Sequence, residues 1–124
     1  MKLKAVKKAA VAFSLLAVSS FAYSSDYVDA FEAASAEDYT KAASIWQKMA
    51  EKGDPTAQFN MGLMYHSGAA GQLDEKQAVT WYQRAAENGH TGAQEYLAAG
   101  YLEGWFGLDK DMEKYEYWTQ RLNQ

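Results

Sequence analysis

Apolar and small residues recur along this chain at helical spacing. In PTAQFNMGLMYHSG, residues 55–68, four of them fall on one helix face at steps of four, one and three: Ala57, Met61, Gly62 and Tyr65. Asp54 precedes the proline as a helix cap, and Gly68 is a typical helix stop. Residues 91–104, TGAQEYLAAGYLEG, show the same face again. The pattern predicts a helix in each stretch.

The two stretches belong to a longer internal repeat. Residues 50–71 align with residues 86–107 at an offset of 36, and eight of the 22 aligned positions are identical. The pairs are Ala50/Ala86, Glu51/Glu87, Gly53/Gly89, Ala57/Ala93, Gln58/Gln94, Tyr65/Tyr101, Gly68/Gly104 and Gly71/Gly107. A fixed period of this length indicates stacked structural units.

Each repeated helix has a predicted partner. Residues 74–89 carry an apolar stripe that includes Trp81 and Tyr82, and residues 38–53 align with them at the same offset of 36. Residues 112–124 align at an offset of 37, because WTQR at Trp118 matches WYQR at Trp81. A short helix within residues 26–37 comes first. With one proline and no β-branched alternation, the chain is predicted to be all-α, six helices forming a two-layer solenoid.

The chain resembles the Sel-1-like repeat family, a short-helix relative of the tetratricopeptide repeats. The residues that carry the resemblance are Ala50, Glu51, Gly53, Ala57, Gln58, Gly62, Tyr65, Gly68, Gly71, Ala78, Trp81, Tyr82, Ala85, Ala86, Glu87 and Gly89. It extends over residues 39–124. The resemblance implies a right-handed α/α superhelix that serves as a protein-interaction scaffold, without a cofactor or a conserved active site.

The first 22 residues have the pattern of a secretory signal peptide. Four lysines (Lys2, Lys4, Lys7 and Lys8) precede the apolar run 9–18, and small residues stand at Ser20 and Ala22. The alternative, a membrane anchor, needs about 20 apolar residues. We therefore expect a signal peptide at 1–22, an N-terminal capping helix at 23–38 and repeats at 39–124. The repeats divide into a half unit at 39–53, a unit at 54–89 and a terminal unit at 90–124.

The charge of the chain and its lack of cysteine limit the kinds of partner and membrane anchor that we expect. The chain has 12 basic and 16 acidic residues. Four of the basic residues lie in the signal segment, so the remainder has eight basic and 16 acidic residues, net −8. Such a chain repels phosphate backbones, which makes nucleic acid an unfavourable partner. There is no cysteine to carry a lipid. We expect a secreted, periplasmic product without a membrane anchor after signal cleavage.

The candidate binding surface is the helix face opposite the repeated one. Helical geometry places Phe59, Asn60 and Leu63 there in the first unit, and Glu95, Tyr96 and Ala99 in the second. In a solenoid such residues line the concave wall. We expect this wall to contact a partner protein.

The loop of the terminal unit differs from its counterpart. Trp105 and Phe106 replace Ala69 and Ala70. Either they fold back and cover the end of the stack, or they form a contact patch, and Tyr117 could join either arrangement. Two and a half units are few for independent stability. We therefore expect marginal stability, or burial of this end by a partner or by a second copy of the chain.

The remaining polar residues do not assemble a predicted active site or metal site. His66 and His90 are expected to be solvated at helix ends, and His66 and Ser67 are adjacent, so they do not face each other on a helix. The acidic stretch 109–113 lacks the glycine and the closing glutamate of a calcium loop, and is expected to cap a helix. The leading hypothesis is a non-enzymatic binding protein, with an immunity protein against a delivered toxin as a narrower form. The alternative is a small envelope hydrolase.

Overall fold

The computed structural model describes residues 25–124, and the predicted signal peptide lies outside this range. Within it the chain forms six α-helices and no strand. The helices are α2 (Ser25–Ser35), α3 (Tyr39–Glu51), α4 (Pro55–Ser67), α5 (Glu75–Glu87), α6 (Thr91–Glu103) and α7 (Met112–Leu122). The prediction of an all-α repeat solenoid is confirmed.

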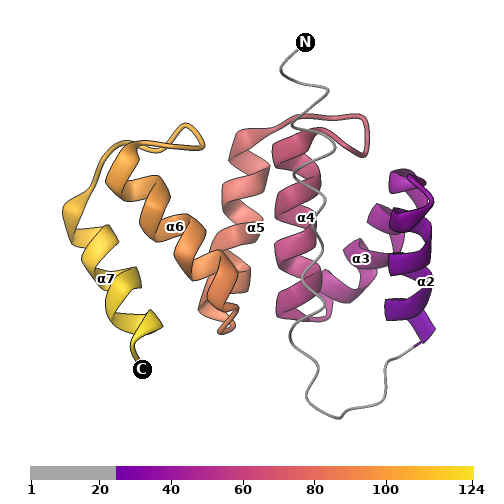
Figure 1. The fold of residues 1–124 in the computed structure, drawn as a ribbon, viewed down its shortest axis with the longest axis horizontal. Coiled ribbons are helices and arrows are strands. Elements are labelled where there is room, and N and C mark those ends of the chain that lie inside the picture. Colours follow the sequence, from indigo (N-terminus) through magenta and orange to yellow (C-terminus); the bar gives the residue numbers. More distant parts are fainter. Residues whose placement is uncertain (1–24) are drawn as a thin grey trace.

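The helices stand side by side in chain order, and each packs against the next (Figure 1). The turns after α2, α4 and α6 lie along one edge, and those after α3 and α5 lie along the other. The most extensive contact joins α4 and α5. Ten of the 13 residues of α4 are buried, whereas only Trp118 is buried in α7. The core is therefore centred on α4 and α5 and thins toward the C-terminal helix.

Side-chain caps define where the helices begin. Asp54 Oδ1 accepts a hydrogen bond from the Ala57 N–H at 2.8 Å, and Asp38, Asp74 and Asp111 cap α3, α5 and α7 in the same way. The Tyr27 hydroxyl donates to the same Asp54 oxygen at 3.0 Å, which ties α2 to the start of α4. Burial raises the pKa of Tyr27 to about 12, so this donor keeps its proton over the physiological range.

Two repeated residue types now have defined structural roles. Gly68 and Gly104 end α4 and α6 in the left-handed conformation, with φ of 67° and 74°. The buried side chain of Gln58 donates to the Ala50 carbonyl at 3.1 Å, and Gln94 donates to the Ala86 carbonyl at 3.0 Å. Each glutamine thus gives a second hydrogen bond to a carbonyl at the C-terminal end of the preceding helix, which also accepts from the N–H of Gly53 or Gly89.

The outer face of α7 is polar. In α5 the buried residues Val79 and Ala86 share one face, and the repeat alignment places Glu116 and Asn123 at these positions of α7. Glu116 and Asn123 are exposed. This face offers little apolar area to a further helix, as expected of a terminal repeat. Self-association through this end stays a prediction.

Gly62 allows the close approach of α4 and α5. A Cβ atom built at this position would collide with the ring of Tyr82, which is fully buried. In the following unit Ala98 takes the place of Gly62, and Thr119 takes the place of the tyrosine. A smaller side chain on α7 thus accompanies the larger residue on α6.

We expect Gly62→Ala to destabilise the protein. Overpacking a core costs about 1–3 kcal/mol, whereas replacing a helical glycine by alanine gains about 1 kcal/mol at most. The free energy of unfolding, measured by urea titration, should therefore fall by about 1–2 kcal/mol. In a double-mutant cycle, Tyr82→Thr should make Gly62→Ala neutral or favourable. A neutral Gly62→Ala in the wild-type background would contradict this packing.

Candidate functional site

The exposed face of α6 carries part of the predicted binding wall. Glu95 and Tyr96 are exposed there, as is Leu102 two turns later, and Ala99 between them is half-buried. Tyr96 is 36% exposed and Leu102 is 37% exposed. Glu95, Ala99 and Leu102 share one side of the helix by their spacing, whereas Tyr96 lies about 120° around the helix from Leu102. Leu102 was not among the predicted residues, although its position one turn beyond Ala99 could have indicated it.

The three predicted binding residues on α4 are buried and do not form an exposed surface. Phe59, Asn60 and Leu63 are buried, and Asn60 is only 3% exposed. Phe59 stacks on His90 with ring centroids 4.4 Å apart and meets Tyr96 edge-on at 5.3 Å. These three side chains are therefore packed within the chain and do not project freely from the wall. Phe59 is drawn inward because rings from the following unit close over it. Binding of a partner by these residues stays a prediction.

Asn60 has an unusual environment for a polar side chain. Among the described residues its Oδ1 has no hydrogen-bond donor, although the atom is buried. A buried acceptor without a donor costs about 1–3 kcal/mol. Between residues 25 and 124 it is the one buried side-chain polar atom without a hydrogen-bond partner.

Trp105 and Phe106 take different roles. Phe106 folds back against the end of the first unit, with its ring 4.8 Å from that of His66 and 5.8 Å from that of Tyr82. Its φ of 59° lies in the left-handed region, which non-glycine residues rarely adopt. Trp105 remains 54% exposed beside it. Phe106 therefore folds back onto the preceding unit, and a contact role for Trp105 stays a prediction.

The two histidines are half-buried and hydrogen-bonded rather than fully solvated, which corrects the expectation from the sequence. His90 caps α6, because its Nδ1 accepts a hydrogen bond from the Ala93 N–H at 3.1 Å. His66 Nδ1 lies 3.3 Å from the Tyr82 hydroxyl. Burial lowers the pKa of both histidines below the usual value of 6.5, although Glu75 near His66 and Asp54 near His90 act in the opposite direction.

Polar groups near His66 have structural roles. The buried Ser67 hydroxyl lies 3.4 Å from the Met64 carbonyl and accepts from the Ala69 N–H at 3.1 Å. His66 and Ser67 therefore do not form the nucleophile–base pair that a hydrolase would need. In the stretch 109–113, Asp111 caps α7, which confirms the capping interpretation. Between residues 25 and 124, no three His, Asp or Glu side chains are arranged to hold a metal ion.

The remaining aromatic candidate, Tyr117, lies on α7. Its side chain is exposed, its ring meets Trp118 edge-on at 4.9 Å, and its hydroxyl accepts from Arg121 at 3.0 Å. These contacts are all within α7. The structure shows no ring contact that joins Tyr117 to Trp105 among the described residues.

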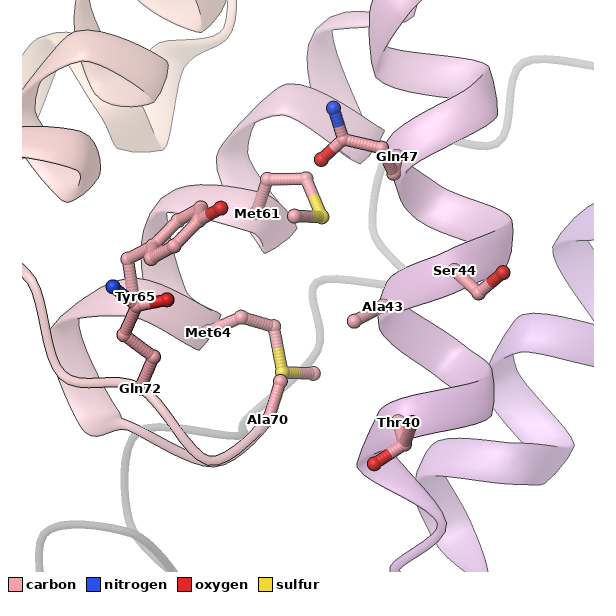
Figure 2. Close-up of a pocket in the computed structure, with 9 residues that line it drawn as sticks. All are labelled: Thr40, Ala43, Ser44, Gln47, Met61, Met64, Tyr65, Ala70 and Gln72. Atoms are coloured by element: carbon pink, nitrogen blue, oxygen red, sulfur yellow. The ribbon is translucent and has the colours of Figure 1, made fainter.

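A groove of about 300 Å³ lies between α3 and α4. Figure 2 shows the side chains of Met61 and Met64 extending from α4 toward Ala43 on α3. Further lining residues are Ser44 and Gln47 from α3, Tyr65 from α4, and Ala70 from the following loop. The sequence reasoning missed this groove. The sequence did contain a signal for the groove. Ala43 and Ala70 are small, whereas the equivalent positions of the next unit carry the larger Val79 and Phe106.

The fold and these surfaces define an α/α repeat solenoid with exposed apolar side chains on α6 and its loop. The family model of the Sel1 repeat matches residues 34–54, 55–90 and 91–121. These matches cover more than half of the chain, and the protein belongs to the Sel1 repeat family. Sel1 repeats indicate a protein–protein interaction scaffold, and the family is typically a non-catalytic interaction module.

One curated relative is the chitin synthase regulator SKT5 of Saccharomyces cerevisiae. It is 35% identical over 74 residues, which are 60% of this chain and 10% of that protein. The chain thus spans about a tenth of the length of this relative. No solved structure matches the chain. None of the helices between residues 25 and 124 has the length and apolar composition needed to cross a bilayer.

The two half-buried histidines predict that the free energy of unfolding falls in mild acid. Unfolded histidine titrates near pH 6.5, whereas both folded pKa values are lower. Between about pH 7.5 and 5.5 the unfolded state therefore binds more protons, and the free energy of unfolding should decrease as the pH falls. Protonation of His90 Nδ1 also removes the acceptor that caps α6.

Urea titrations at the two pH values test this prediction. In His90→Asn the asparagine still caps the helix but does not titrate, so the loss of stability between the two pH values should be smaller than in wild type. An equal loss in both proteins would contradict the role assigned to His90.

Proposed function

We propose that the chain binds a protein partner through a surface formed by Tyr96 and Leu102 on α6 and Trp105 in the following loop, here called the α6 surface. The observation that carries the proposal is the exposure of these three apolar side chains, which is 36%, 37% and 54%. Large aromatic and aliphatic residues of this kind are the usual anchors of protein interfaces. Membership of a repeat family of interaction scaffolds supports the same assignment.

Ring contacts inside the chain fix the position of Tyr96 in the α6 surface. Tyr96 contacts the rings of Phe59, Tyr82 and Phe106 at centroid distances of 5.3, 5.4 and 6.0 Å. A tyrosine fixed in this way loses little further conformational entropy on binding, which favours affinity. Leu102 and Trp105 extend the surface beyond this fixed ring. We assign the anchoring role to these two residues, because they are freer of internal contacts than Tyr96.

The proposal includes export from the cytoplasm, on the basis of the basic and apolar pattern of residues 1–22. The partner would then be a protein of the cell envelope or its surroundings, which includes the delivered toxin that an immunity protein would bind. The acidic surplus of residues 23–124, eight basic against 16 acidic, favours a neutral or basic partner surface.

The proposal predicts that Leu102→Glu and Trp105→Glu weaken partner binding. Loss of one interface anchor costs at least about 1–2 kcal/mol, which is about a tenfold loss of affinity or more. The measurement is co-purification of partners from envelope extract, quantified by mass spectrometry, followed by titration of the recovered protein. The matched control is Leu73→Glu, since Leu73 is equally apolar and 50% exposed but lies in the α4–α5 loop.

Retention of the same partners at unchanged affinity by both α6-surface variants would contradict the proposal. Circular dichroism melting of all three variants separates a loss of binding from a loss of folding. Because Leu102 and Trp105 are exposed, their substitution should leave the thermal midpoint nearly unchanged.

A further inference from the structure

The groove between α3 and α4 has a counterpart in the next repeat unit that the chain fills itself. The repeat offset of 36 relates Met64 to Gly100, Ala70 to Phe106 and Gln72 to Leu108. A Cβ atom at Gly100 would lie 3.0 Å from Leu108 and 3.1 Å from Phe106. In the second unit two apolar loop side chains therefore pack onto α6, where the absence of a side chain at Gly100 makes room for them.

The first unit fills the corresponding space less completely. Met64 projects from the helix, but the loop offers only Ala70 and Gln72, and a groove of about 300 Å³ remains. A hydrogen bond that joins α5 to α6 also has no counterpart between α3 and α4. Gln83 donates to the Tyr101 hydroxyl at 3.3 Å, whereas the equivalent Gln47 donates to Glu51 at 2.7 Å within its own helix. The groove therefore stays open between Gln47 and Tyr65.

The lining defines the chemistry of an occupant. Met61 and Met64 have flexible, polarisable side chains that adapt to aromatic or aliphatic groups. Every lining residue is uncharged, so the groove offers no ion pair to a charged side chain inside it. At its rim the carboxylate of Glu51 engages Gln47, and residues 23–124 carry an acidic surplus. A basic residue beside the apolar group is therefore favoured, and an acidic one is disfavoured.

We propose that this groove binds a turn segment of a protein partner that presents an aromatic and an aliphatic side chain two residues apart, followed by a basic residue. The model for this occupant is the chain's own Phe106–Gly107–Leu108, which packs at the equivalent place in the second unit. The site uses residues of α3, of α4 and of the α4–α5 loop, and is separate from the α6 surface. It adds a second contact to the proposed scaffold function.

Methionine methyl groups provide the direct test. The full chain with 13C-labelled methionine methyl groups is titrated with the peptide acetyl-Phe-Gly-Leu-Lys-amide and followed by NMR. The signals of Met61 and Met64 should shift and saturate, with a dissociation constant on the order of 1 mM for so short a peptide. Met49, which is buried in α3, and Met112, which is exposed at the start of α7, serve as internal controls and should not respond.

Two repeat-equivalent substitutions make a matched pair. Ser44 and Thr80 are exposed, lie at the same repeat position on α3 and α5, and only Ser44 lines the groove. Ser44→Phe should reduce the affinity for the peptide at least tenfold, and Thr80→Phe should leave it unchanged. Leu102→Glu should also leave it unchanged, so this proposal and that of the α6 surface can fail independently. Thermal melts confirm that each variant is folded.

Several results would overturn the proposal. These are unshifted Met61 and Met64 signals, an equal response to acetyl-Ala-Gly-Ala-Lys-amide, or equal binding by Ser44→Phe. A response that is no weaker when glutamate replaces the lysine of the peptide would refute its charge preference. Shifts of Met61 and Met64 on dilution of the protein alone would assign the groove to a second copy of the chain.

Discussion

The contact between the Tyr82 ring and the bare backbone of Gly62 is the constraint on which the rest of the structure depends. It brings α5 against α4 at a distance that no larger residue at position 62 would permit. The same ring is the centre of an aromatic cluster, with Phe59, Tyr96 and Phe106 at centroid distances of 5.6, 5.4 and 5.8 Å. Tyr82 therefore positions α6 and its loop as well as α5.

The proposed function follows from this arrangement. Because Phe106 is held against Tyr82 and His66, the adjoining Trp105 is left exposed at the edge of the stack. Tyr96 is fixed by its ring contacts, and Leu102 is exposed nearer the C-terminal end of α6, on a different side of the helix. The positions that repeat between units, such as Gln58 and Gln94, satisfy helix ends. The positions that differ between units form the surfaces to which we assign binding.

Much of the fold could be predicted from the sequence, because local chemistry determines it. Asp54 followed by Pro55 predicts the start of α4, and Gly68 predicts its end, since each acts on the nearest turn of the chain. The environment of Phe59 could not be predicted in this way. A helical projection gives the direction of a side chain, but the burial of Phe59 depends on His90 and Tyr96, which are more than 30 residues away.

The same limit applies to the histidines and to the terminal loop. The partner of His66 is Tyr82, 16 residues away. The left-handed conformation of Phe106, a residue type that does not favour it, follows from packing against Gly100 and the first unit. The glycine at position 100 looks unfavourable for a helix when the sequence is considered alone. Its reason becomes visible once Phe106 and Leu108 are seen to occupy the space.

Native-state amide hydrogen exchange tests the central claim most directly. If the contact of Gly62 with Tyr82 organises the molecule, the amides in the middle of α4 and α5 should be the most protected and should exchange with one common opening free energy. Those of α2 and α7 should exchange through smaller openings, because these helices bury fewer residues. Equal or greater protection in α7, or separate opening free energies for α4 and α5, would contradict the account.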